Sequence, residues 1–268
     1  MTILKKYSLN QLREQWNYNE IDTVVVGNPI YEFEEVSSTM DVVKSEFSTT
    51  SGGVVVSCRQ TKGIGRFDRE WHSDDEKDLL FSYILNIPIE QLHTMLFINS
   101  ISLLRTVSDM VDNSVFIKWP NDIYCNQEKI AGILTKTELI SDRALVIVGI
   151  GLNVNSDEDF FLSKKLKATS LKSLTGKTYN KRRILYNFLN KLNKIFAQQL
   201  NDDDVFKEWK DSLNLIGETI NFSFMTNQKI VLNAIVEDID SIGRLKIRNS
   251  SGKESFLSSE EITIVNEK

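Results

Sequence analysis

The hydrophobic and polar positions of residues 31–154 follow strand-like and helix-like patterns in turn. Apolar and β-branched runs bounded by turn residues predict strands over 31–36, 53–60 and 79–87, and a succession of strands over 115–154. Apolar residues recur at helical spacing over 89–111, after Pro88, where a helix could start. Ser38 or Thr39 could cap a short helix that runs to about Phe47. Because strands follow one another in long runs, we expect an α+β fold with a mixed or antiparallel sheet.

The pattern differs on either side of this region. Residues 8–17 could form a short helix, and residues 182–199 form a strongly amphipathic one, followed by another short helix around 205–213. One stripe of the long helix carries its apolar residues, Ile184, Leu185, Phe188, Leu189, Leu192, Ile195 and Phe196. Beyond Gly217 the apolar period changes to two, with turn signals between the runs, which predicts a small all-β barrel or sandwich. The expected organisation is an N-terminal extension over 1–30, a main domain over 31–215 and a β domain over 216–268.

Composition and charge narrow the class of protein. Of the 268 residues, 41% are hydrophobic and 26% are charged, which is ordinary globular composition, and no signal peptide or membrane-spanning run is evident. Two cysteines and two histidines are too few for a disulfide framework or an ordinary zinc site. A net charge of −5 disfavours nucleic-acid and acidic-membrane partners, and the first 30 residues are too short and too neutral for a DNA-reading domain. We expect a soluble, cytoplasmic protein.

A basic, glycine-containing segment stands out within this acidic chain. Residues 59–71 read RQTKGIGRFDREW, with four basic residues against two acidic ones. Glycines let a backbone approach an anion closely, and arginine side chains bind phosphate oxygens in bidentate fashion. The segment matches neither a Walker loop nor a dinucleotide fingerprint. A phosphate-binding loop and an ordinary solvated loop both remain open at this point.

Two further segments carry candidate chemistry. Lys118 ends a predicted strand before the turn-forming residues 119–122, so it could hold a positive charge against a carboxylate or phosphate, or be a surface lysine beside a packed turn. Gly149 and Gly151 interrupt an apolar strand. Small residues there indicate close approach by a ligand or another backbone, although core packing explains them equally well.

Together these segments resemble the biotin protein ligases. The family's loop G-R-G-R-x-x-R-x-W is similar to residues 63–71 (GIGRFDREW), and its K-W-P-N-D block is present at 118–122, followed by KIAGIL at 129–134. The family's G-x-G-[IL]-N-x-N and A-T-S-L stretches match residues 149–155 and 168–171. An upstream S-T-N-like element reads Ser38-Thr39-Met40. The similarity runs from about residue 31 to the C-terminus.

The resemblance implies a fold, a reaction and partners. The fold is a catalytic domain like that of class II aminoacyl-tRNA synthetases over 31–215, with an SH3-like β domain over 216–268 and without the N-terminal DNA-binding domain of some relatives. The reaction joins biotin and MgATP into biotinyl-5′-AMP and pyrophosphate, then biotinylates one lysine of a biotin carboxyl carrier domain of a carboxylase. ATP and Mg²⁺ are the implied cofactors, with Mg²⁺ on the ATP phosphates and no metal site of the chain's own. Relatives often dimerise through the sheet, which makes a homodimer a candidate assembly.

The resemblance also implies roles for individual residues. Catalytic roles fall to Arg66, Arg69 and Lys118, which would screen the repulsion between a carboxylate and a triphosphate. Biotin contacts fall to Ser38, Thr39, Gln60, Gly63, Ile64, Gly65, Trp71, Lys118 and Gly132. ATP or adenylate contacts fall to Arg66, Arg69, Trp71, Asn121 and Asn153. The first three biotin residues would hydrogen-bond the ureido ring, and the loop 61–72 would seal the site when ligand binds.

Four positions depart from the family pattern. Ile64 replaces the first arginine of the loop, Met40 stands where Asn is common, Asp68 where Gly or Asn is frequent, and Lys136 where Glu is frequent. The first two could be changes of the acid pocket. Two other functions therefore remain in view: a ligase for lipoate or another carboxylic acid, and a non-catalytic biotin-binding module.

Overall fold

The computed structural model describes residues 3–16, 24–198 and 202–265, and contacts divide the chain into two compact units, 1–205 and 206–268. The first unit is built on an eight-stranded sheet in the order β1-β2-β3-β4-β8-β7-β6-β5. The β2–β3 pair is parallel and the other pairs are antiparallel, so the predicted mixed sheet is confirmed. The strands are β1 (Ile3–Tyr7), β2 (Ile30–Val36), β3 (Val54–Gln60), β4 (Leu79–Pro88), β5 (Val115–Lys118), β6 (Asp122–Cys125), β7 (Glu128–Ile140) and β8 (Arg143–Leu152).

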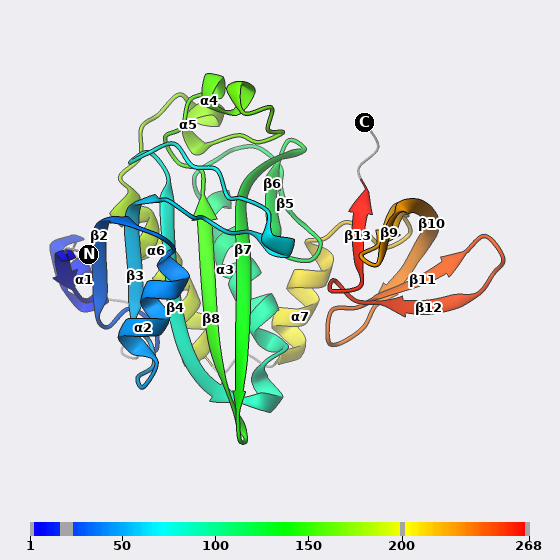
Figure 1. Cartoon of the computed structure of the whole chain (residues 1–268), viewed down its shortest axis with the longest axis horizontal. Helices are drawn as coiled ribbons and strands as arrows, with labels where there is room; N and C mark the ends of the chain where they lie inside the picture. The colour runs from blue at the N-terminus through cyan, green and yellow to red at the C-terminus, as the bar shows by residue number, and fades with distance from the viewer. Residues whose placement is uncertain (1–2, 17–23, 199–201, 266–268) are drawn as a thin grey trace. The chain divides into compact units, whose positions relative to one another are not determined.

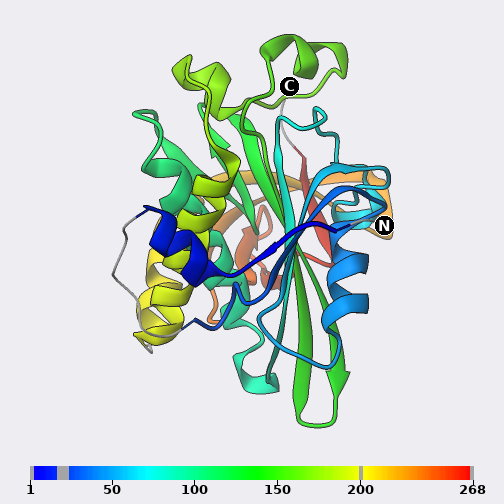
Figure 2. The ribbon, with the colours of Figure 1, turned by 90° about the vertical axis from the view of Figure 1, so that its left-hand side faces the viewer.

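Helices cover both faces of this sheet. Helix α2 (Thr39–Phe47) lies on one face, and α1 (Leu9–Trp16), α3 (Thr94–Ser108) and α6 (Lys181–Ala197) lie on the other (Figures 1 and 2). Two short helices, α4 (Glu158–Ser163) and α5 (Leu171–Thr175), lie beyond one end of the sheet (Figure 1). The middle of the sheet is therefore buried on both sides, as the nearly continuous apolar runs of β4 and β8 require.

The helix expected over 89–111 is shorter than its apolar pattern. β4 continues through Pro88, which pairs with Arg143, and a single 3₁₀ turn at Ile89–Gln91 follows before α3 begins at Thr94. The prediction that a helix could start at Pro88 is wrong in this respect, because the strand pairing holds the chain extended up to that residue. The amphipathic stripe of α6 is buried as predicted up to Ile195, and Phe188 packs edge-on against Phe81 of β4 with ring centroids 5.2 Å apart.

The N-terminal segment is part of the first unit. β1 pairs with β2, and Leu9 of α1 is fully buried. Asn193 of α6 accepts the backbone N–H groups of Val25 (2.6 Å) and Val26 (2.9 Å) and donates to the carbonyl of Val26 (2.7 Å). One buried amide therefore fastens the connection that leads into β2.

The second unit is an all-antiparallel sheet, which confirms the predicted all-β C-terminal part. Its order is β12-β11-β10-β9-β13, and the contacts place its beginning at Phe206, within α7 (Asp202–Asp211), whereas the sequence pattern places it at residue 216. The strands are β9 (Thr219–Phe224), β10 (Asn227–Ile239), β11 (Leu245–Asn249), β12 (Glu254–Leu257) and β13 (Ile262–Val265).

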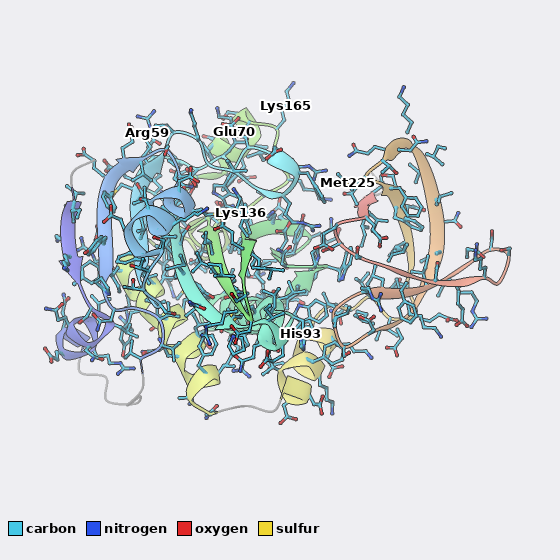
Figure 3. All side chains as sticks on the ribbon, turned by 60° about the horizontal axis from the view of Figure 1, so that its bottom comes forward. Arg59, Glu70, His93, Lys136, Lys165 and Met225 are labelled. Atoms are coloured by element: carbon cyan, nitrogen blue, oxygen red, sulfur yellow. The ribbon has the colours of Figure 1, made fainter. Side chains whose placement is uncertain are left out.

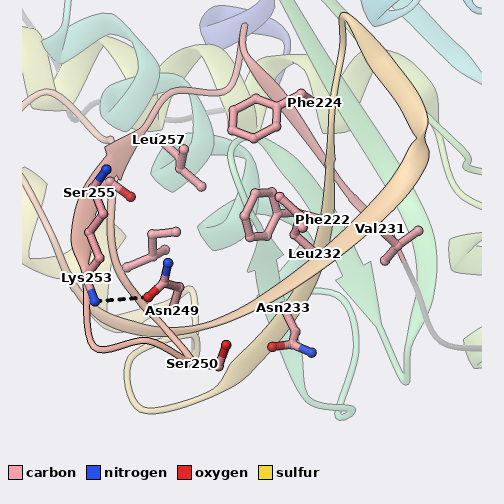
Figure 4. A pocket seen from close by; sticks show the side chains of 11 residues that line it. Phe222, Phe224, Val231, Leu232, Asn233, Asn249, Ser250, Lys253, Ser255 and Leu257 are labelled. Carbon is pink, nitrogen blue, oxygen red and sulfur yellow. Dashed lines mark hydrogen bonds between the residues drawn. The ribbon is translucent and has the colours of Figure 1, made fainter.

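A hollow of about 440 Å³ opens on this second sheet (Figure 4). Its walls include Phe222 and Phe224 of β9 and Val231 and Leu232 of β10. The pairing of β9 with β10 is interrupted between Asn227 and Leu232, so the period-two pattern there does not bury Ile230 or Leu232. None of the helices that the structure describes is long and apolar enough to cross a membrane.

Candidate functional site

A chain of polar side chains, in which Thr39 and Ser82 are buried and Gln60 is half-buried, joins the start of α2 to β3 and β4. The side-chain amide oxygen (Oε1) of Gln60, the last residue of β3, accepts from the backbone N–H of Thr39 (2.7 Å) and from the Thr39 hydroxyl (3.0 Å). The Thr39 hydroxyl also lies 2.7 Å from the Ser82 hydroxyl of β4. Ser38 caps α2, accepting from the Met40 N–H at 3.3 Å. Because β2 and β3 run parallel with Val36 opposite Gln60, the three residues expected to read a ureido ring lie together.

The loop 61–72, the glycine-arginine loop, is hydrogen-bonded to these strand ends. The backbone N–H of Lys62 donates to the carbonyl of Ser37 (2.9 Å). Within the loop, the backbone N–H of Gly65 donates to the carbonyl of Arg69 (2.7 Å), and that of Trp71 donates to the carbonyl of Gly63 (3.0 Å). Ile64 forms a bridge with Glu70, which Figure 3 labels. The loop is therefore held in a turn by hydrogen bonds between its own residues. The expectation that it seals the site when ligand binds stays a prediction.

Trp71 ends this loop on the surface of the sheet. Gly132 of β7 and Gly151 of β8 are paired, and a Cβ added at Gly151 would lie 2.4 Å from Cε2 of the Trp71 indole. At Gly132 the same addition would meet Cζ3 of Trp71 at 3.0 Å. Glycine at 151 is thus explained by close approach of a side chain rather than by core packing alone. The Trp71 Nε1 is buried and has no hydrogen-bond partner among the described residues.

The other glycine of the β8 pair has a different neighbour. A Cβ on Gly149 would lie 2.8 Å from Cγ and Sδ of Met40. Met40 is buried in the apolar cluster between α2 and the sheet. The Met40 position that departs from the family pattern therefore packs directly over β8, next to the polar chain.

The block 118–122 turns sharply between two paired strands. Lys118 pairs with Asp122, the Trp119–Pro120 peptide is cis, and the Asn121 side chain donates to the carbonyl of Ile133 (2.6 Å). The Asn121 Oδ1 is buried without a hydrogen-bond partner among the described residues. Asp122 binds Lys129 with 2.6 Å between Oδ2 and Nζ.

Lys118 is a half-buried cation. Its Nζ lies 4.9 Å from the centre of the Tyr124 ring. Burial lowers the pKa of the Lys118 ammonium from its ordinary value, and the Asp122 carboxylate partly opposes this shift. An ammonium in this setting keeps a strong attraction for an anion because it has lost part of its hydration.

The remaining predicted residues are Arg66 and Arg69 in the loop and Asn153 after β8. The Arg66 guanidinium lies 4.8 Å from the centre of the Phe67 ring, while Arg69 is exposed. Asn153, just past β8, donates to the carbonyl of Thr169 (2.9 Å) and so holds the segment 168–171. The structure thus gives Asn153 a structural contact of its own, and its expected nucleotide contact stays a prediction.

Two of the positions that depart from the family pattern, Asp68 and Lys136, make no contact with the polar chain that the structure records. Asp68 has a left-handed backbone (φ 56°), and Lys136 is exposed on the outer half of β7. Figure 3 places His93, just before α3, at the other end of the sheet from Glu70. Within residues 3–16, 24–198 and 202–265, no group of three or more His, Cys, Asp or Glu residues could hold a metal ion.

Sequence reasoning missed three residues of this region: Ser82, Lys129 and Asp122. Ser82 left a signal, since it is the one serine within the largely apolar run LLFSYILNI. The Lys129–Asp122 pair left none beyond its place in two motifs, because its two residues meet only when β6 and β7 pair.

Three comparisons with known proteins bear on this site. Residues 32–153 match the profile of the biotin/lipoate A/B protein ligase family. The chain is 31% identical over 175 residues to a bifunctional ligase/repressor BirA of Bacillus subtilis (63% of this chain, 54% of the relative). It is 36% identical over 148 residues to biotin–protein ligase 2 of Arabidopsis thaliana (52% and 45%). The chain thus spans about half the length of the curated relatives it matches.

Solved structures agree with the fold. A biotin protein ligase from Aquifex aeolicus in complex with biotin and ATP superposes with a TM-score of 0.71 at 25% identity, covering 89% of this chain and 99% of that one. A biotin protein ligase from Leishmania major in complex with biotinyl-5-AMP gives 0.60 at 24% identity, covering 86% and 98%, and supports the fold alone. These comparisons support the resemblance that the motifs indicate, and the expected fold class is confirmed.

Proposed function

Because residues 32–153 match the profile of the biotin/lipoate A/B protein ligase family, we propose that this chain is an ATP-dependent biotin protein ligase. In the first step a biotin carboxylate oxygen attacks the α-phosphorus of MgATP, and pyrophosphate leaves. In the second step a lysine amine of a biotin carboxyl carrier domain attacks the acyl carbon, and AMP leaves. The observation that carries the proposal is the hydrogen-bonded Gln60–Thr39–Ser82 chain beside a loop rich in glycine and arginine.

Recognition of the acid is assigned to the polar chain and the loop. Ser38, Thr39 and Gln60 bind the ureido ring, and the backbone of residues 63–65 faces it. Trp71 covers the hydrocarbon part of the acid above Gly132. The absence of side chains at Gly132 and Gly151 supports this assignment, since a Cβ at either position would lie within 3.0 Å of the indole.

Catalysis is assigned to positive charge. The reaction brings a carboxylate to a triphosphate, so cations fixed near both groups lower the barrier by stabilising charge in the transition state. Lys118, partly desolvated at the end of β5, serves the carboxylate and the α-phosphate, while Arg66 and Arg69 close over the phosphates with the loop. The chemistry forms no covalent bond to the enzyme. Asn121 and Asn153 are assigned to the nucleotide side, and the unpartnered Asn121 Oδ1 supports this for Asn121.

The proposal extends to the partner and to the organisation of the chain. The acceptor is a biotin carboxyl carrier domain of a carboxylase, and residues 31–215 form the catalytic domain with 216–268 as an accessory β domain. Self-association through the large sheet is included in the proposal. Size-exclusion chromatography with light scattering tests that last part independently of activity.

The deciding experiment incubates the purified chain with MgATP and biotin, lipoate, octanoate or no acid, and detects acyl-AMP and pyrophosphate by mass spectrometry. Biotinyl-AMP from biotin alone supports the proposal. An adenylate from lipoate or octanoate supports the second candidate, a ligase for another acid, which the Met40 and Ile64 departures favour. If no acid gives an adenylate, the catalytic proposal is wrong and a binding module remains.

A further inference from the structure

The polar chain has only one consistent arrangement of protons. A backbone N–H can only donate, so the Gln60 atom 2.7 Å from the Thr39 nitrogen is the carbonyl oxygen. The Thr39 hydroxyl lies 3.0 Å from that same oxygen, which carries no proton, so the hydroxyl must donate to it. The orientation of the Gln60 amide therefore follows from the chain's own contacts.

This arrangement fixes what Ser82 does. A threonine hydroxyl has one proton, and that of Thr39 is already given to Gln60. The 2.7 Å contact between the Thr39 and Ser82 hydroxyls must therefore be a donation from Ser82 to Thr39. Ser82 has no exposed surface, so water does not compete for this bond.

The arrangement also fixes what the chain offers to a ligand. The Gln60 Nε2 points away from Thr39 and toward the loop, 3.3 Å from where a Cβ on Gly63 would lie, and it carries two N–H donors. The Thr39 oxygen retains a lone pair and has no proton left to give. The chain therefore offers donors at Gln60 Nε2 and an acceptor at the Thr39 oxygen, which complements a ligand edge bearing both a carbonyl and an N–H.

We propose that Ser82 is a specificity-determining positioning residue, which holds the Thr39 hydroxyl as an acceptor and so selects a carboxylic acid with a cyclic urea or amide edge. A dithiolane ring has neither a carbonyl nor an N–H, so it leaves the Gln60 donors unpaired in the closed site. This inference rests on the proposed function and deepens it, because it separates biotin from lipoate on the donors and acceptors of one hydrogen-bonded chain.

The test measures biotin binding by calorimetry without ATP, so that recognition is read apart from chemistry. Loss of one buried hydrogen bond is expected to weaken biotin binding of Ser82→Ala about tenfold. In the adenylate assay the KM for biotin should rise while the KM for ATP stays the same. Ser100→Ala is the matched control, since Ser100 is equally buried but donates to the Leu96 carbonyl (2.8 Å) within α3. It should bind biotin as the unchanged chain does.

A double-mutant cycle distinguishes positioning from a general structural effect. If Ser82 acts through the Thr39 hydroxyl, Ser82→Ala should change biotin binding less than twofold in a Thr39→Val background. Ser82→Cys, which keeps the volume with a weaker donor, should fall between serine and alanine, and it replaces the alanine variant if that one does not fold. Full additivity, or unchanged binding by Ser82→Ala, overturns the inference.

The same measurement separates the two proposals. A chain that binds biotin with the expected Ser82 dependence but makes no biotinyl-AMP refutes the ligase function and leaves the specificity inference standing. A chain that makes biotinyl-AMP while Ser82→Ala binds biotin normally refutes the inference alone. A chain that does not bind biotin refutes both.

Discussion

Gly151→Ala tests whether the position of the Trp71 indole over the sheet determines the affinity for biotin. The added methyl group would lie 2.4 Å from Cε2, 2.5 Å from Cζ2 and 2.8 Å from Nε1 of Trp71, well inside any normal contact. Gly151 pairs with Leu80 on one side and with Gly132 on the other, so the strand cannot yield. The indole must retreat by about 1 Å to reach the ordinary contact distance of about 3.5–4.0 Å.

We expect Gly151→Ala to weaken biotin binding while the protein remains folded. Overpacking of this kind costs about 1–3 kcal/mol, which corresponds to a roughly five- to 150-fold weaker affinity for biotin if binding requires the present position of the Trp71 ring. Because Trp71 belongs to a loop, the loop can absorb the displacement, and the melting temperature should change by only a few degrees. Calorimetry with biotin and thermal unfolding measure the two effects separately.

The control is Gly149→Ala, two residues away on the same face of β8. Its methyl group would meet Cγ and Sδ of Met40 at 2.8 Å, and an unbranched thioether can bend away at lower cost than a ring can. The effect on biotin affinity should therefore be smaller than that of Gly151→Ala. Trp71→Phe placed in the Gly151→Ala chain replaces the fused indole with a single smaller ring and should restore part of the affinity. Equal affinities for both alanine variants and the unchanged chain would refute the reasoning.

Further predictions concern a pKa and a buried amide. If the Lys118 cation is needed, the lowered pKa means that adenylate formation falls as pH rises through that pKa, below the range of an ordinary lysine, and Lys118→Arg should move this limb to higher pH. A pH profile of pyrophosphate release checks this, and identical basic limbs would contradict it. Asn193→Ala leaves the N–H groups of Val25 and Val26 and one carbonyl without their partner, so the free energy of unfolding should fall by about 3 kcal/mol. Urea unfolding measures this, and a loss under about 1 kcal/mol would argue against it.

Local pattern predicted most elements of the large sheet because their burial is set by neighbours close in the chain. The runs of β4 and β8 are apolar on both faces, which indicates central strands whatever the topology. The Ser38 cap was likewise readable, since a serine before an apolar helical run satisfies the first N–H groups locally. The end of β4 was not readable, because only its pairing with β8 keeps Pro88 extended.

The residues of the candidate site that the sequence predicted are likewise those that belong to local motifs, and those it missed depend on contacts distant in the chain. The motifs pointed to Gln60, Thr39, Trp71 and Lys118, but Ser82 was missed because its contact joins residues 43 positions apart. The meaning of Gly151 was open for the same reason: its neighbour Trp71 comes from a loop whose path the pattern does not give. In the second unit the period of two continues through Ile230 and Leu232, yet an interruption in pairing with β9 leaves both exposed.

The proposed function places recognition and charge on different kinds of structure. In the Gln60–Thr39–Ser82 chain, Thr39 and Ser82 are buried and hydrogen bonds hold all three side chains at the sheet, so in the proposed function they discriminate between ring edges without rearranging. The arginines lie on a loop that is closed by its own hydrogen bonds. Trp71 connects the two, since it ends the loop and rests on paired glycines of the sheet. Filling either glycine beneath Trp71 should therefore disturb the loop and its charges before it disturbs the polar chain. A variant of the polar chain should do the reverse, losing the choice of acid while the handling of ATP remains.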